Sequence, residues 1–452
     1  MAARSFERSE QLFARGKTYF PLGVNSPGRA FKEVDTPALI IESAQGARIR
    51  DVDGNEYVDF IMGLGPCLLG HNPKPVVEAI RKQADRGLVY GINSALESEL
   101  AQRITDAIDT AEQIRFTCSG TEACMSALRV ARAHTQRPAL LKFKGGYHGH
   151  SDIALAKASK KSIRDNQHKV RSGLHTFIDE HTFVVDYNDV PAVREVFARE
   201  AEKLSAVILE PVGSNMGLVR PTPEFLLTLR QLCDEHGVLL IFDEVVTGFR
   251  FRYGSIAKLL GVAPDMVTLG KVIGGGLAAG AYGARSEIMD QVGSIGSVFQ
   301  GGTFAGNPLT MAAGIATLDM LSAPGIYEHI NSVAGRFVAV IRAGFAKKGI
   351  PFSIDQFGAL VSFIFNETRD RNTCFADVQT QDYDLFRVFH TEMAHRGYLF
   401  PPTIEEPIFF SAAHSLEDAE GAAAIAVEVI AELRERRRQQ TREKQVELEY
   451  AG

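Results

Sequence analysis

The strongest constraint on the fold is a regular alternation of short apolar runs with longer amphipathic segments. Each run is a few residues long and is bounded by polar residues or glycine, which is typical of a buried strand. The segments between them carry helix start and stop signals, as in Thr121–Thr135 and Pro223–His236. This alternation predicts an α/β fold with a mostly parallel sheet covered by helices. We expect strands at Ile114–Cys118, Ala139–Phe143, Thr182–Val185, Ala206–Leu209, Leu239–Phe242, Met266–Leu269 and Ala281–Gly283.

The regions on either side of this alternation have a different pattern. Ala47–Arg50 and Glu56–Phe60 flank a glycine-containing turn and predict a hairpin. Toward the C-terminus, Phe337–Lys347 has an apolar helical face and Ala359–Phe365 predicts a strand, before a final charged helix. We therefore expect three segments, 1–65, 66–323 and 324–452, of which the middle one holds the sheet.

The composition excludes several classes of protein. Of the 452 residues 23% are charged, and the net charge of −6 predicts no attraction to nucleic acid or membrane. The basic run Arg434–Arg442 is interrupted by Glu435, which indicates a solvated helix face. The five cysteines are scattered without metal-ligand spacing, so we expect reduced thiols, no metal site and a cytoplasmic location. The polar segment Met1–Glu10 and the lack of a long apolar stretch predict neither a secretory signal nor a transmembrane helix.

Lys271 follows an expected strand and enters a loop of very small residues. The sequence there is Thr268-Leu-Gly-Lys271-Val-Ile-Gly-Gly-Gly276. Desolvation by apolar neighbours favours the neutral amine of a lysine, and a neutral amine can form a Schiff base with an aldehyde. The glycines let the backbone approach a bulky ring. Taken alone, the motif also fits a solvated lysine before a flexible turn, or a phosphate loop at Gly274–Gly276.

Asp243 favours the Schiff-base interpretation of Lys271 over the solvated lysine and the phosphate loop. It ends the apolar run Leu239–Phe242, one helix and one strand before Lys271. An enzyme that uses pyridoxal 5′-phosphate (PLP) needs a carboxylate on the pyridine nitrogen, since that proton makes the ring an electron sink. An aspartate at this place could also cap a helix, but an acid directly after an apolar strand favours a buried functional carboxylate. We therefore expect Lys271 and Asp243 to be the catalytic residues of a PLP enzyme.

Two further motifs lie where expected strands end. Ser119-Gly120-Thr121-Glu122 separates a strand from a helix, and N–H groups at a helix start bind phosphate well, together with hydroxyls. The spacing of Ser119 and Glu122 also matches a capping box, and the two roles are compatible. Tyr147, in Gly146-Tyr-His-Gly-His150, is suited to stacking on a cofactor ring. The two histidines at this spacing are poor indicators of a metal site.

The order of these motifs resembles class III aminotransferases, and within them the glutamate-1-semialdehyde 2,1-aminomutase subgroup. The likeness spans roughly residues 8 to 430, and several motifs together make it specific. The segments Gly23–Phe31 and Glu210–Gly217 are similar to the subgroup in particular. The matching motifs are Ser119-Gly-Thr-Glu-Ala, Tyr147-His-Gly-His, Glu210-Pro, Asp243-Glu-Val, Lys271-Val-Ile-Gly-Gly-Gly and Gly302-Thr-Phe-Ala-Gly-Asn-Pro.

The resemblance implies a PLP enzyme of fold type I. Its large domain would hold a mostly parallel seven-stranded sheet, and the N- and C-terminal segments would form a smaller α+β domain. It also implies a homodimer with shared active sites, acting on a small-molecule amino donor and a carbonyl acceptor. The cofactor would pass through its pyridoxamine 5′-phosphate form during the cycle.

The same resemblance implies a role for each site residue. Lys271 would hold the cofactor and, once freed, would move a proton between the substrate Cα and cofactor C4′. Asp243 would pair with the pyridine nitrogen. The other cofactor contacts would be Tyr147 and Val245 on the two ring faces, Ser119, Gly120 and Thr121 on the phosphate, Asn215 near the phenolic oxygen, and Thr303 on the phosphate of the neighbouring subunit. The substrate contacts would be Ser26, Arg29, Leu64, Glu210, Glu405 and Glu406.

The chain departs from the subgroup mainly around the substrate. Leu64 stands where the subgroup commonly has tryptophan, and the loop Phe400–Pro407 is one residue longer, so that either Glu405 or Glu406 matches the gating glutamate. Residues 154–164 lack the usual small-residue gating stretch, and the tail Arg434–Gly452 runs past the usual end. With the cofactor motifs intact, these departures favour a changed substrate.

Two enzyme functions therefore compete. Leu64 and the longer loop favour an aminotransferase that acts on another aldehyde or ketone, for example in an amino-sugar, antibiotic or other natural-product pathway. Gly23–Phe31 favours the alternative, a true glutamate-1-semialdehyde 2,1-aminomutase of tetrapyrrole biosynthesis. A PLP-binding regulator is disfavoured, because there is no room for a DNA-binding module before Pro21. A dehydrogenase is disfavoured, because no strand–GxGxxG–helix unit is present.

Overall fold

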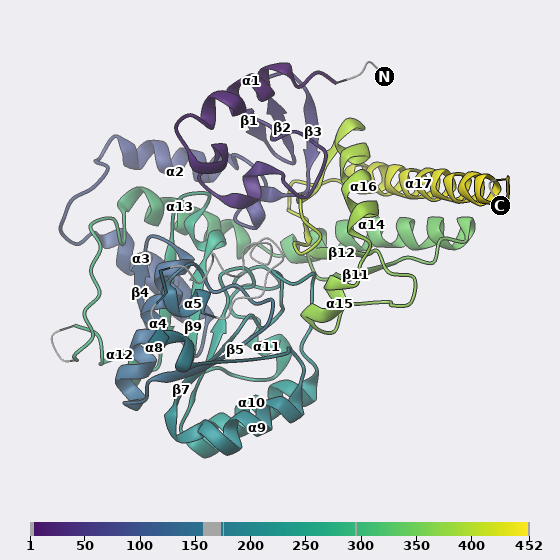
Figure 1. The fold of residues 1–452 in the computed structure, drawn as a ribbon. Coiled ribbons are helices and arrows are strands. Elements are labelled where there is room, and N and C mark those ends of the chain that lie inside the picture. The colour runs from purple at the N-terminus through teal and green to yellow at the C-terminus, as the bar shows by residue number, and fades with distance from the viewer. Residues whose placement is uncertain (1–3, 157–172, 175, 294–295, 451–452) are drawn as a thin grey trace. The chain divides into compact units, whose positions relative to one another are not determined.

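The computed structural model describes residues 4–156, 173–174, 176–293 and 296–450. The described chain divides into two compact units (Figure 1). The larger unit comprises 65–327 and 372–379, and the smaller unit comprises 1–64, 328–371 and 380–452. The sequence assigned 372–379 to the C-terminal segment. Its helix α15 (Phe375–Gln379) instead belongs to the larger unit, where Asn372 donates a hydrogen bond to the Gly217 carbonyl at 2.9 Å.

The larger unit is built on one sheet. In the described residues this sheet has seven strands, in the order β4-β10-β9-β8-β7-β5-β6. β10 pairs antiparallel with both of its neighbours, and the pairs from β9 to β6 are parallel. Every residue of β5, β7, β8, β9 and β10 is buried, as expected for strands covered on both faces. The strand bounds are β4 (Gln113–Thr117), β5 (Ala139–Phe143), β6 (Thr182–Val185), β7 (Leu204–Leu209), β8 (Leu239–Asp243), β9 (Met266–Gly270) and β10 (Gly280–Ala284).

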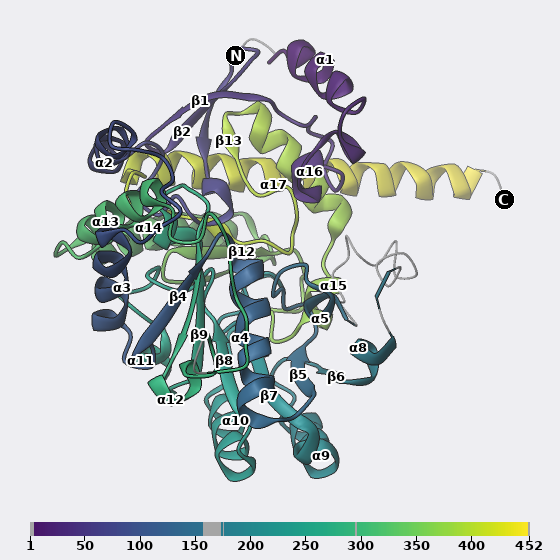
Figure 2. The ribbon, with the colours of Figure 1, turned by 90° about the vertical axis from the view of Figure 1, so that its left-hand side faces the viewer.

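Helices cover the sheet as the alternation predicted. α4 (Gly120–Thr135) follows β4 directly and packs along β7, β9 and β10, as Figure 2 shows. α10 (Pro223–His236) packs on β8 and ends at Gly237, whose φ of 62° is a left-handed conformation that glycine adopts readily. The other helices of this unit are α2 (Lys74–Ala84), α3 (Ala95–Ala107), α5 (Asp152–Leu155), α8 (Thr176–Glu180), α9 (Val190–Glu200), α11 (Ala257–Leu260), α12 (Ser286–Met289) and α13 (Pro308–Leu321), with 3-10 turns η4 (Ala201–Lys203) and η5 (Lys271–Gly274).

The smaller unit contains both ends of the described chain. Phe337, on its long helix, is fully buried and contacts the rings of Phe60, Phe363 and Phe410. The described strands form two sheets, β1-β2-β3-β13 and β11-β12-β14. Their bounds are β1 (Ile41–Gln45), β2 (Arg48–Asp51), β3 (Glu56–Asp59), β11 (Ser353–Phe357), β12 (Leu360–Ile364), β13 (Tyr398–Leu399) and β14 (Ile408–Phe409), and the helices and turns are α1 (Glu7–Gly16), η1 (Pro21–Gly23), η2 (Pro27–Ala30), η3 (Met62–Leu64), α14 (Ile326–Lys348), α16 (Tyr383–His395) and α17 (Leu416–Tyr450).

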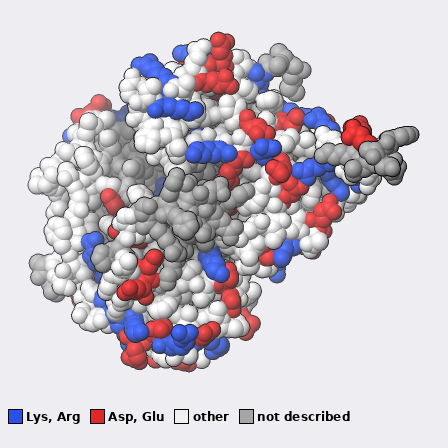
Figure 3. Space-filling view, in the orientation of Figure 1, with Lys and Arg blue, Asp and Glu red and all other residues white. Residues whose placement is uncertain are grey.

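The surface carries charges of both signs. Lys and Arg are interspersed with Asp and Glu over the face drawn in Figure 3. Arg434 and Arg437, from the basic run on α17, form ion pairs with Glu367 and Asp382, which supports a solvated helix face. No single helix of the described chain has the length and apolar content needed to cross a membrane, and the adjoining α13 and α14 meet that test only when taken together.

Glu244 is buried directly after β8, beside another acid, Asp243. Its carboxylate accepts hydrogen bonds from the Ser255 hydroxyl and, at 3.0 Å, from the Ile256 N–H. Burial nevertheless raises the pKa of Glu244 from 4.5 to about 7, because desolvation penalises the charged form more than these donors favour it. The folded protein therefore holds a proton on Glu244 that the unfolded chain releases at lower pH.

Glu244 should make the protein less stable as the pH rises. Between about pH 4.5 and 7 the unfolded chain has lost this proton while the folded chain retains it, so the free energy of unfolding falls with pH, by about 3 kcal/mol in total. Glu244→Gln removes the titration but can keep both hydrogen bonds. Urea unfolding at pH 5 and pH 8 should therefore show that the free energy of unfolding of the variant, relative to that of the wild type, is higher at pH 8 than at pH 5. The exposed Glu235→Gln is the matched control, and equal pH dependence of wild type and Glu244→Gln would contradict the assignment.

Candidate active site

A cavity of about 430 Å³ opens where the parallel strands of the larger unit end. Because β4, β5, β7, β8 and β9 run parallel, the residues that follow them meet at one edge of the sheet. The cavity contains most of the residues that the sequence assigned to cofactor binding. It is lined by Pro66, Cys118, Ser119, Gly120, Thr121, Cys124, Tyr147, Gly149, Glu210, Asn215, Asp243, Val245, Val246, Lys271, Gly276, Leu277, Ala278 and Ala279.

Lys271 is held in a strained backbone conformation. It follows β9 with a φ of 46°, in the left-handed region that residues with a Cβ avoid. Such a residue costs of order 1–3 kcal/mol and persists only where its surroundings enforce it. Gly275 provides part of that enforcement, since a Cβ there would lie 2.6 Å from the Ala313 carbonyl oxygen. This closely packed loop places Lys271 in the lining of the cavity, which supports the catalytic role that the sequence predicted.

Asp243 lines the cavity and is almost completely buried. Within the described chain its carboxylate accepts four hydrogen bonds. Burial alone would raise the pKa of Asp243, but the His148 ring and the other donors outweigh it and hold that pKa below 3.8. Asp243 is therefore an anion near neutral pH, while its neighbour Glu244 stays mostly protonated below about pH 7. The donors are His148 Nδ1 at 2.7 Å, the Val245 N–H at 3.1 Å, the Thr268 hydroxyl at 3.1 Å and the Cys124 thiol at 3.3 Å.

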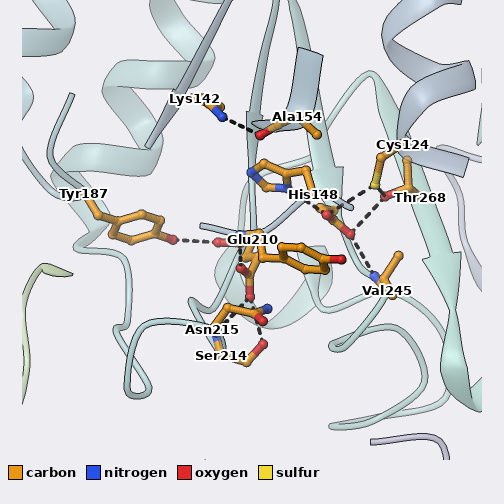
Figure 4. A network of polar contacts seen from close by, with 12 residues as sticks. Cys124, Lys142, His148, Ala154, Tyr187, Glu210, Ser214, Asn215, Val245 and Thr268 are labelled. Carbon is orange, nitrogen blue, oxygen red and sulfur yellow. Dashed lines mark hydrogen bonds and ion pairs between the residues drawn. The ribbon is translucent and has the colours of Figure 1, made fainter. Parts of the chain in front are cut away.

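His148 is a site residue that the sequence did not predict. It follows Tyr147 and was considered only as a weak metal ligand. Its Nε2 is buried and has no hydrogen-bond partner among the described residues. A proton on Nδ1 lets the ring donate to Asp243 and leaves only a lone pair at Nε2, which costs less than a buried unpaired N–H. The imidazole thereby fixes the carboxylate as part of a buried network of polar contacts (Figure 4).

The start of α4 presents the kind of donors that bind an anion. Its first N–H groups have no acceptor inside the helix and lie beside the hydroxyls of Ser119 and Thr121. Gly120 is required at this point, because a Cβ would lie 2.8 Å from Val245 Cγ1. The capping box expected here is only partly formed. The Ser119 hydroxyl accepts from the Glu122 N–H at 3.2 Å, whereas the Glu122 carboxylate accepts from the Cys118 N–H at 2.6 Å.

Glu210 organises a loop at the cavity wall. Its Oε1 accepts from the Tyr147 N–H at 3.0 Å, and its Oε2 accepts from the Ser214 N–H at 2.9 Å, the Ser214 hydroxyl at 2.8 Å and the Asn215 N–H at 3.3 Å (Figure 4). The Tyr187 hydroxyl donates to the Glu210 carbonyl at 2.8 Å. These bonds occupy the carboxylate and position Tyr147 and Asn215. The geometry therefore favours a positioning role for Glu210, and the substrate contact expected from the sequence stays a prediction.

The donor set of the cavity fits PLP. It offers a lysine for the aldehyde, an ionised carboxylate for the pyridine nitrogen and a helix start for the phosphate. Tyr147, 40% exposed, and Val245, pressed against Gly120, provide apolar surfaces for a flat ring. No cluster of three or more His, Cys, Asp and Glu side chains suited to a metal ion occurs in the described part of the chain. The chemistry of the cavity is thus that of an organic cofactor with an aldehyde and a phosphate.

The remaining expected residues lie outside this cavity. Thr303 is exposed and lines a separate hollow of the larger unit, with Tyr90 and Asn307. The others belong to the smaller unit: Ser26 and Arg29 are exposed, Leu64 has a φ of 62°, and Glu405 is buried and Glu406 half-buried in the loop 400–407. Their substrate roles stay predictions. Most of the expected difference in the 154–164 gating stretch falls outside the described residues.

Known proteins resemble most of the chain. The aminotransferase class-III family matches residues 30–430. The glutamate-1-semialdehyde 2,1-aminomutase 2 of Geobacillus thermodenitrificans is 43% identical over 431 residues, which are 95% of this chain and 100% of that protein. The crystal structure of an ω-transaminase from Sphaerobacter thermophilus has a TM-score of 0.84 at 26% identity, covering 93% of this chain and 96% of that one. A glutamate-1-semialdehyde aminomutase variant from Pseudomonas aeruginosa PAO1, in complex with PMP, has a TM-score of 0.83 at 25% identity, covering 94% and 95%.

These similarities agree with the geometry of the cavity. The family match covers most of the chain, and the solved neighbours share the seven-stranded, mostly parallel sheet and fold type I that the sequence predicted. PMP, bound in the Pseudomonas structure, is the amine form of the cofactor inferred from Lys271 and Asp243. The chain belongs to the class-III aminotransferases and is a PLP-dependent enzyme.

Proposed function

We propose that this enzyme is a glutamate-1-semialdehyde 2,1-aminomutase, which moves an amino group within its substrate. The observation that carries the proposal is the 43% identity to the Geobacillus aminomutase over the full length of that protein. The segment Gly23–Phe31 supports it as well, through its resemblance to the same subgroup. The relatives thus favour the aminomutase, which the sequence analysis gave as the alternative to an aminotransferase with another substrate. An amino-sugar or antibiotic pathway, which the substitutions near the substrate had suggested, gains no specific support from them.

The residues of the cavity have distinct tasks in such a reaction. PLP, when bound, supplies an electron sink for negative charge that develops at the substrate Cα. Asp243 would keep a proton on the pyridine nitrogen, since it is buried and ionised. The Lys271 amine, on its constrained loop, would carry a proton between the substrate Cα and cofactor C4′. The N–H groups and hydroxyls at the start of α4 would hold the phosphate, and Arg29 is our candidate for the substrate carboxylate.

An intermolecular aminotransferase is the second candidate. The ω-transaminase from Sphaerobacter thermophilus matches the fold about as well as the Pseudomonas aminomutase does. Leu64, in place of the tryptophan common in aminomutases, removes a large aromatic surface and favours a different substrate. The two candidates differ in one chemical requirement. An aminomutase needs no second substrate, whereas an aminotransferase needs both an amino donor and a carbonyl acceptor.

The enzyme, loaded with pyridoxamine 5′-phosphate, should isomerise glutamate 1-semialdehyde without any added amino donor. Mass-balanced product analysis should show one amino ketone isomer formed for each substrate consumed, with the cofactor returning to the amine form. Lys271→Ala is the inactive control, and Lys258→Ala, an exposed lysine paired with Asp109, is the matched active control. Failure to convert this substrate, combined with transfer from a simple amine to an aldehyde, would overturn the aminomutase proposal in favour of the second candidate.

We also propose a homodimer with shared active sites in the cytoplasm. Thr303 is exposed and lies apart from the Lys271 cavity within one chain. Around it Phe299 is 83% exposed, Phe304 62% and Ile92 81%, and exposed aromatic and aliphatic groups of this size favour a surface that another protein covers. A second copy of this chain would bring Thr303 to its partner's phosphate. The cysteines are free in the described chain, which is consistent with a reducing compartment.

Subunit mixing tests the shared site. Lys271→Ala and Thr303→Ala should each be strongly impaired as separate homodimers, because each site lacks one contact. After subunit exchange, one of the two sites in a mixed dimer combines wild-type Lys271 with the partner's wild-type Thr303, so up to about half of the dimers should regain one site. Native mass spectrometry verifies the exchange. Complete exchange without recovered activity would contradict sharing, as would a monomeric enzyme.

A further inference from the structure

The Asp243 carboxylate has four donors from the described chain itself. A carboxylate offers about four lone-pair sites. In the described chain the Val245 N–H and the Thr268 hydroxyl occupy Oδ1, and His148 Nδ1 and the Cys124 thiol occupy Oδ2. The pyridine N–H of PLP would be a fifth donor. One of the four protein donors must therefore weaken or leave when the cofactor binds.

Three of these donors are poorly suited to leaving. The Val245 N–H is part of the backbone, and His148 makes the shortest contact, at 2.7 Å. Its ring is buried, and its Nε2 has no hydrogen-bond partner among the described residues, so the contact with Asp243 is the one that orients the ring. The Thr268 hydroxyl, at 3.1 Å, lies on the buried strand β9. Withdrawing the Val245 N–H or the His148 Nδ1–H would leave a polar hydrogen buried and unpaired, at a cost of about 1–3 kcal/mol. The Thr268 hydroxyl could turn to the Cys124 Sγ, but sulfur is a much weaker acceptor than a carboxylate.

The Cys124 thiol is different in two respects. A thiol is a weak donor, and this one is already the longest contact, at 3.3 Å. It also has a second partner, since its Sγ lies 3.4 Å from the Thr268 Oγ1. The Thr268 hydroxyl gives its own proton to Asp243 and so has a free lone pair for the thiol. Rotation about the Cβ–Sγ bond moves the proton from one acceptor to the other without displacing a heavy atom.

We propose that the Cys124 thiol is an exchangeable hydrogen-bond donor to Asp243. Without the cofactor the thiol donates to the Asp243 carboxylate, and when the pyridine nitrogen binds there the thiol donates to the Thr268 hydroxyl instead. Cys124 lines the cavity and is fully buried on α4, so no water is needed for the exchange. Its thiol keeps its proton, because burial and the nearby Asp243 raise its pKa well above the usual value. It is a positioning residue for Asp243, and its role depends on the PLP cofactor and not on the identity of the substrate.

The thiol proton can be observed directly. A hydrogen bond to a carboxylate lowers the S–H stretching frequency more than one to a hydroxyl does. The Raman S–H band of Cys124, isolated as the difference between wild type and Cys124→Ser, should therefore move to higher frequency when the apoenzyme is loaded with PLP. The matched control is Cys233→Ser, a buried cysteine on α10 whose band should not move. A Cys124 band that is the same in apoenzyme and holoenzyme would overturn the proposal.

Cofactor affinity gives a second, independent readout. Without the thiol the apoenzyme loses a hydrogen bond to a charged group that the holoenzyme does not use. Cys124→Ala, which removes the thiol, and Cys124→Val, which replaces it with two methyl groups, should therefore bind PLP more tightly than wild type, by about two- to tenfold. The chain has no tryptophan, so cofactor absorbance in equilibrium dialysis is the measurement. If the Cys124 thiol served only to fill space, both variants would bind PLP as tightly as wild type or more weakly. Either of these results, with the affinity of the control variant Cys233→Ala unchanged, would contradict the proposal.

Discussion

The buried contact between Asp243 and His148 is the interaction on which the site depends. It joins the end of β8 to the segment that follows β5, across 95 residues of sequence. Burial alone would raise the pKa of a carboxyl group in this position, and the imidazole, together with the other donors, outweighs that effect. The neighbouring Glu244 experiences the same burial without such a partner and retains its proton to about pH 7. Two adjacent acids thus differ in charge because their hydrogen-bond partners differ.

The topology of the larger unit brings the other groups to the same place. Parallel strands end at a common edge, so the ends of β4, β5, β7, β8 and β9 and the segments after them supply all of the cavity lining except Pro66. Close approach then fixes the geometry. Because Gly120 has no Cβ, the Val245 side chain can pack against it, and because Gly275 has none, the Ala313 carbonyl can pack against the Lys271 loop. The left-handed backbone of Lys271 is maintained by this packing, which places strain where a covalent bond to a cofactor is made.

Local patterns in the sequence predicted most of the fold and the principal site residues. The apolar runs identified every strand of the central sheet to within two residues, and Lys271 and Asp243 stood out because each follows such a run. His148 and Cys124 could not be found in this way, since their contacts with Asp243 cross 95 and 119 residues of sequence. The Glu122 carboxylate bonds the Cys118 N–H in place of the Ser119 N–H, a shift of one residue that spacing alone does not reveal.

The central claim is that Lys271 carries PLP in a cavity organised by Asp243. Borohydride reduction of the holoenzyme, followed by peptide mass spectrometry, tests it most directly, because it converts the cofactor linkage into a stable mark on the lysine that holds it. The account predicts that the mark lies on the peptide containing Lys271, that Lys271→Ala abolishes it while the protein stays folded, and that Lys258→Ala leaves it unchanged. A reduced cofactor on another lysine, or an undiminished mark in Lys271→Ala, would contradict the account.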